Sequence, residues 1–68
     1  MRTILVAKTQ AAAKLAAPEG VEPLGVRGSC YSTPDKVIFS GPLQLDEKVW
    51  DWLMRDVHLF DVKEVEWR

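Results

Sequence analysis

The sequence predicts a small α/β protein with a mostly parallel, Rossmann-like sheet of three or four strands and two helices. Two apolar runs predict it, Thr-Ile-Leu-Val-Ala at 3–7 and Lys-Val-Ile-Phe at 36–39. Neither run alternates with polar residues, which is typical of strands covered on both faces, as in parallel sheets. Each run is followed by a break and then by a helix-compatible stretch, so the predicted element order is β-α-β-β-α-β.

The first half of the chain contains two strands with a helix between them. Residues 3–8 form the first strand, and Thr9 is expected to cap an alanine-rich helix over 10–17. Pro-Glu-Gly at 18–20 ends that helix. Residues 21–27 form the next strand, where Pro23 and Gly25 predict an edge position, because proline lacks a ladder donor and glycine weakens a strand.

The second half begins with a loop over 28–35 and the buried strand at 36–39. Asp46 is expected to cap a helix over 47–59, and 62–67 form a half-exposed strand. Helical periodicity places Trp52 outside the apolar arc of that helix, beside Asp56. It places six apolar side chains on the core-facing arc: Val49, Trp50, Leu53, Met54, Val57 and Phe60.

The connection over 28–35 leaves a second architecture open. About eight residues would suit a hairpin, whereas a parallel crossover usually takes a dozen or more. A hairpin there would give a ferredoxin-like α+β fold, whose sheet has one bare face. The lack of alternation in the two apolar runs favours the parallel sheet instead. Two helices do not fully cover both faces of such a sheet, so this arrangement also predicts a partner subunit.

Length and charge limit the possible functions. The 68 residues make one domain, 1–68, with a small core, so oligomerisation is the expected route to further burial. Nine basic against ten acidic residues provide no basic field for phosphate backbones, so nucleic-acid binding is disfavoured. A nucleic-acid accessory would have to use Arg2, Lys8, Lys14 and Arg27. We expect no membrane segment and, from the single cysteine, a cytoplasmic location.

Polar side chains follow the two apolar strands, where open α/β sheets bind their ligands. The predicted site contains Lys8, Thr9, Gln10 and Ser40. Free amides at a helix start attract anions, so a small anionic ligand or nucleotide is one hypothesis for this edge. Against it, the sequence has neither G-x-G-x-x-G nor G-x-x-x-x-G-K-[ST], and Thr9 can serve as a cap alone. No cofactor is therefore expected.

No catalytic or metal-binding set is evident. Cys30 lies in a predicted loop, and nothing in the spacing brings it to the only histidine, His58. One cysteine and one histidine are too few for the zinc sites considered, and the acidic residues alternate with basic ones, as on a solvated face. We therefore predict that the protein is not an enzyme.

The density of tryptophan indicates an interaction surface. Trp50 is expected in the core, whereas Trp52 with Asp56, and separately Trp67, are candidates for a protein interface. The alternative is that Trp52 and Trp67 both pack at the rim of the same small core, since a domain of this size needs every large apolar side chain. The sequence leaves both interpretations open.

Two segments carry a resemblance to known proteins. Residues 1–11, Met-Arg-Thr-Ile-Leu-Val-Ala-Lys-Thr-Gln-Ala, and residues 35–40, Asp-Lys-Val-Ile-Phe-Ser, resemble short proteins from phages of actinobacteria. These look like fragments of a nucleotide-binding α/β domain, and the resemblance covers about the first 40 residues. The chain departs from a working domain of that kind because it lacks a phosphate loop and has Ser40 and Gly41 where an acidic metal ligand would stand. The resemblance implies a phage-encoded accessory protein in a bacterial cytoplasm.

Together these observations predict a small non-catalytic interaction protein that self-associates through sheet edges or the tryptophan-bearing helix. A host or phage protein is a further expected partner. The alternative function is binding of a small anionic ligand at the carboxyl end of the sheet.

Overall fold

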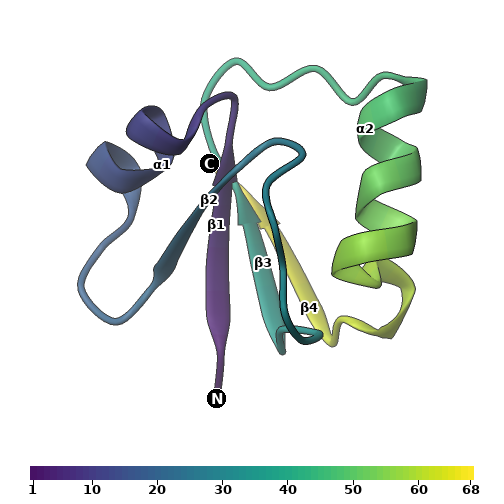
Figure 1. The fold of residues 1–68 in the computed structure, drawn as a ribbon. Helices are drawn as coiled ribbons and strands as arrows, with labels where there is room; N and C mark the ends of the chain where they lie inside the picture. The colour runs from purple at the N-terminus through teal and green to yellow at the C-terminus, as the bar shows by residue number, and fades with distance from the viewer.

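The computed structural model describes all 68 residues as a sheet with helices on its two faces (Figure 1). The strands and helices are β1 (Thr3–Ala7), α1 (Gln10–Ala16), β2 (Glu22–Gly25), β3 (Lys36–Phe39), α2 (Glu47–Trp52) and β4 (Glu64–Trp67). The α2 helix continues directly into a π-helical turn, η1 (Leu53–Val57), and a 3₁₀ turn, η2 (Leu59–Asp61), precedes β4. The β-α-β-β-α-β order predicted from the sequence is therefore confirmed.

The four strands form one sheet in the order β2-β1-β3-β4, and every neighbouring pair is parallel. The two apolar strands, β1 and β3, lie side by side at its centre, and β2 lies at an edge as predicted. Because β2 and β3 are not neighbours, residues 26–35 form a parallel crossover, and the ferredoxin-like alternative is wrong. Ten residues suffice because this crossover contains no helix.

The two helices lie on opposite faces of the sheet. The connection from β1 leads to β2 at one end of the sheet, whereas the connection from β3 leads to β4 at the other end. Because crossovers between parallel strands are right-handed, connections that run in opposite directions place their helices on opposite faces. On the α1 face, Ala13 packs against three strand residues. The α2 face holds the larger cluster: Ile4, Val6, Leu24, Val37, Phe39, Leu43, Val49, Trp52, Leu53 and Val57.

The crossover takes the place of a third helix on the α2 face. Val26 and Cys30 from this loop pack against the larger cluster. The Trp52 indole Nε1 donates a hydrogen bond of 2.9 Å to the carbonyl of Gly28. The loop is thus tied to α2 and covers part of the sheet face that α2 alone would leave open.

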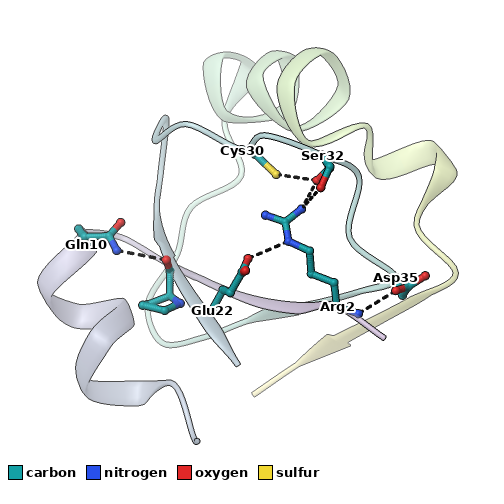
Figure 2. Close-up of polar contacts among 7 residues, drawn as sticks. Arg2, Gln10, Glu22, Cys30, Ser32 and Asp35 are labelled. Atoms are coloured by element: carbon teal, nitrogen blue, oxygen red, sulfur yellow. Dashed lines mark hydrogen bonds and ion pairs between the residues drawn. The ribbon is translucent and has the colours of Figure 1, made fainter. Parts of the chain in front are cut away.

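Arg2 fixes the other end of the crossover (Figure 2). Its guanidinium pairs with Glu22 at 2.8 Å and donates to the carbonyl and the hydroxyl of Ser32. Its backbone N–H donates to the Asp35 carboxylate at 2.8 Å, and its carbonyl accepts from the backbone N–H groups of Asp35 and Lys36. Arg2 was named above as a candidate nucleic-acid contact, but its side chain and backbone are bonded within the protein and hold the crossover in place.

The predicted arc of the second helix is partly wrong. Trp52 is 3% exposed and lies in the core, whereas Trp50 is 41% exposed and Phe60 69% exposed. The cause is the crossover loop, which offers Trp52 an apolar surface and a carbonyl partner on a helix flank that periodicity assigns to solvent. The α-helix also ends earlier than predicted, since the chain changes to π-helical hydrogen bonding at Leu53.

The helical segment stops at His58, which has the left-handed conformation with φ of 56°. This position is normally occupied by glycine, because other residues place their Cβ close to a carbonyl oxygen there. The His58 ring contacts Phe60 with a centroid separation of 6.0 Å.

We therefore expect His58→Gly to raise the free energy of unfolding by about 1 kcal/mol, measured by urea denaturation. His58→Ala removes the same ring contact but keeps the Cβ, so it serves as the matched control and should not stabilise the protein. Equal stabilisation by both substitutions would show that the backbone conformation is not the cause.

Candidate functional site

The carboxyl ends of β1 and β3 meet at the point where the strand order reverses, which is where open α/β sheets bind ligands. A hollow of about 400 Å³ lies there. Lys8, which follows β1, is the one member of the predicted ligand site that lines it. The complete lining is Lys8, Val26, Pro42, Leu43, Gln44, Asp46 and Val49.

The other predicted members have partners within the protein. The Thr9 hydroxyl accepts from the backbone N–H of Ala12 at 3.1 Å, as expected of a helix cap. Ser40 is half-buried and donates its backbone N–H to the carbonyl of Val6. In the hollow itself the Asp46 carboxylate caps α2 by accepting from Val49 N–H at 2.9 Å. The hollow therefore carries one cation and one carboxylate.

Gln10 closes the β2 edge of the sheet. Val26 N–H bonds to β1, so by alternation Pro23 and Gly25 direct their backbone groups outward. The Gln10 side chain accepts from Gly25 N–H at 2.8 Å and donates to the Pro23 carbonyl at 3.1 Å (Figure 2 shows the latter). Gly25 permits the start of α1 to approach β2 this closely, because a Cβ there would lie 2.5 Å from the backbone nitrogen of Gln10. Pro23 has no N–H, and Gln10 already occupies the Pro23 carbonyl and the Gly25 N–H, so little remains for another strand to pair with.

The opposite edge, β4, is open. Glu64 N–H and Arg68 N–H bond to carbonyls of Asp35 and Phe39 on the inner side. By alternation Glu66 also faces inward, and Val65 and Trp67 direct their N–H and carbonyl groups away from the sheet. An exposed strand edge of this kind can accept another strand.

Apolar side chains flank this open edge on the α2 face. Val65 and Trp67 pair in register with Val37 and Phe39, and the rings of Phe39 and Trp67 lie 5.3 Å apart. Trp50 and Met54 lie one turn apart on the helix flank opposite Trp52. Because Trp52 meets Gly28 of the loop that leaves β2, and β4 lies at the other end of the sheet, we infer that the opposite flank faces β4. We call these four the β4-edge surface; their exposed fractions are 41% for Trp50, 39% for Met54, 51% for Val65 and 53% for Trp67.

The other face of β4 carries a charge network. Lys36 pairs with Glu64 at 3.0 Å and with Glu66 at 3.1 Å, and Glu66 also pairs with Arg68. The hydrogen bonds from Lys36 to Glu64 and Glu66 raise the pKa of Lys36. Hydrogen bonds from Arg68 and Lys36 lower the pKa of Glu66. The two faces of the edge strand therefore differ, with charges on the α1 face and apolar side chains on the α2 face.

The predicted interface residues have different outcomes. Trp67 is half-exposed at the open edge, where the sequence suggested an interface. Trp52 is buried, so the prediction that it lies on the surface is wrong. Asp56 is exposed and lies 3.7 Å from the Arg55 guanidinium, on the Trp52 side of the helix. Sequence analysis missed Trp50 and Met54 because periodicity placed them in the core.

The remaining reactive side chains have ordinary surroundings. The Cys30 thiol is partly exposed and donates to the Ser32 carbonyl at 3.3 Å (Figure 2), and the His58 ring contacts Phe60. No group of three histidine, cysteine or acidic side chains is placed to hold a metal ion.

No protein-family model, no curated protein and no solved structure matches this chain. None of its helices has both the length and the apolar character needed to cross a lipid bilayer.

The contact between Asp35 and Arg2 generates a pH dependence. The Arg2 backbone N–H holds the pKa of Asp35 below its ordinary value of 3.8. A lowered folded-state pKa stabilises the protein above the unfolded-state pKa, and this stabilisation is lost as the pH falls through the folded-state value.

We expect Asp35→Asn to lower the free energy of unfolding at neutral pH and to flatten its decline below about pH 4. Urea denaturation between about pH 2 and pH 7 measures both effects. Glu19→Gln, which removes an exposed carboxylate in the turn after α1, is the control for loss of charge alone. A decline in Asp35→Asn as steep as in the wild type would contradict the role of Asp35.

Proposed function

We propose that this protein is a small non-catalytic interaction module that associates with copies of itself through the β4-edge surface. The observation that carries the proposal is the difference between the two sheet edges. Gln10 and Pro23 close the β2 edge, whereas β4 has free backbone groups beside four partly exposed apolar side chains. Sheets that end in an open, apolar edge pair readily with another chain.

The size of the protein supports the same proposal. A domain of 68 residues buries only about 60% of the surface of its unfolded chain, so its stability alone is marginal. Covering the β4-edge surface would add burial at the place where the core ends, next to Phe39. The sequence resemblance supplies the setting we propose, that of a phage-encoded accessory protein in a bacterial cytoplasm, with a host or phage protein as a further partner.

Light scattering after size-exclusion chromatography tests self-association. From about 1 mM to about 1 μM, the range of weak to moderate affinities, we expect the mass to fall from dimer to monomer. Met54→Lys should weaken the dimer at least about tenfold, because an ammonium would replace an apolar contact.

Leu15→Lys is the matched control for Met54→Lys. Leu15 is 91% exposed on α1, on the opposite face of the sheet, so this variant should dimerise like the wild type. Circular dichroism verifies that both variants are folded. A wild-type monomer at every concentration would refute the proposal.

The hollow at the carboxyl end of the sheet supports a second candidate function, binding of a small anionic ligand or nucleotide. Its location at the reversal of strand order and the presence of Lys8 favour this candidate. Asp46 in the same lining opposes it, which is why we rank it second.

Thermal unfolding with a panel of nucleotides at millimolar concentration tests the second candidate. A ligand that binds only the folded state raises the midpoint as its concentration increases. We expect the increase to be lost in Lys8→Ala and kept in Lys14→Ala, which removes a lysine from the exposed side of α1. No shift in the wild type, or equal shifts in all three proteins, would exclude this site.

A further inference from the structure

The open edge also carries information on how two copies would join, an inference that rests on the proposed self-association. A symmetric pair of edge strands runs antiparallel about a two-fold axis perpendicular to the sheet. Residues directly opposite one another must both direct their backbone groups across the junction, or both away from it. The axis therefore passes through a residue and not between two residues. Because Val65 and Trp67 are the outward residues of β4, we compare the axis positions at residues 65, 66 and 67.

Charge distinguishes these three registers. With the axis at Val65, Glu64 of each copy faces Glu66 of the other, which places like charges opposite one another twice. With the axis at Trp67, Glu66 faces Arg68, but Val65 finds no partner within the strand. With the axis at Glu66, Glu64 faces Arg68 twice and Val65 faces Trp67 twice, so charged pairs form on one face and apolar pairs on the other.

The register centred on Glu66 also uses all the free edge groups. Val65 and Trp67 of the two copies exchange their N–H and carbonyl groups in two hydrogen-bonded pairs. The one like-charged contact, between the two Glu66 side chains, is offset, since each already accepts from its own Lys36 and Arg68.

The apolar side chains complete this arrangement. An axis perpendicular to the sheet keeps both α2 helices on the same face, so Trp50 and Met54 of each copy flank the paired β4 strands. The half-exposed Val65 and Trp67 then lie beneath two helices instead of beside one.

We propose that two copies join their β4 strands antiparallel, with Glu66 opposite Glu66, to form one continuous eight-stranded sheet. The strand order is then β2-β1-β3-β4 in the first copy followed by β4-β3-β1-β2 in the second. The two outer edges of this sheet are the β2 edges that Gln10 closes. Growth beyond two copies is thereby blocked.

Disulfide trapping tests the register, with Cys30→Ser as the background of every variant. Glu66 and its counterpart form a non-hydrogen-bonded pair with Cα atoms about 4.5 Å apart, within the range that a disulfide spans. We expect Glu66→Cys to give a covalent dimer at least about tenfold faster than Glu64→Cys, whose two copies lie about 13 Å from their counterparts along the strands. An equimolar mixture of Glu64→Cys and Arg68→Cys should form a covalent mixed dimer faster than either variant alone forms a covalent dimer with itself.

Three outcomes are decisive. Faster trapping by Val65→Cys or Trp67→Cys would overturn the Glu66-centred register. A wild-type dimer by light scattering with no trapping at any β4 position would overturn pairing through β4 while leaving self-association intact. A monomeric wild type would refute the proposed function itself. Circular dichroism of the reduced variants establishes that each one is folded before oxidation.

Discussion

The parallel pairing of β1 with β3 is the contact on which the rest of the structure depends. Their side chains are buried on both faces, so the chain has to supply cover on both sides of the sheet. It has two short helices for this task. The small α1 covers one face beside β2, and α2 with the crossover loop covers the other. Trp52 and Arg2 hold the crossover loop in place, because this loop contains no helix or strand of its own.

The helices and the crossover loop leave most of β4 uncovered. On the α1 face, beyond the reach of α1, ion pairs among Lys36, Glu64, Glu66 and Arg68 replace apolar packing. On the α2 face, α2 lies over the centre of the sheet, and its outer flank leaves Trp50 and Met54 partly in solvent. The open edge and the partly covered apolar side chains therefore have a common origin, a sheet one strand wider than the helices can cover.

Because the β2 edge is closed, only the β4 edge has backbone groups free to pair with another strand. A side-chain amide has one donor and one acceptor group, so Gln10 can occupy the outward groups of Gly25 and Pro23 as a neighbouring strand would. Protection at one edge and none at the other suits a protein that pairs once. The carboxyl-end hollow, in contrast, has a mixed charge, since the Asp46 carboxylate that caps α2 lies in the same lining as Lys8.

Local patterns in the sequence were enough to determine the element order, the two central strands, the caps at Thr9 and Asp46 and the edge position of β2. Each of these depends on the residues themselves or on near neighbours in the chain, such as unbroken apolar runs or a proline in a strand. The parallel crossover at 26–35 was supported only indirectly, because its length also suits a hairpin.

Only the tertiary structure decided which tryptophan is buried, what Gln10 and Arg2 do, and which edge stays open. Periodicity treats a helix as a cylinder against one flat surface, whereas Trp52 meets a loop that arrives from 24 residues earlier in the chain. Gln10 and Arg2 act through partners 13 or more residues away, which no local pattern reveals. The sequence by itself therefore determined the scaffold, and long-range packing decided the surface through which we propose that it associates.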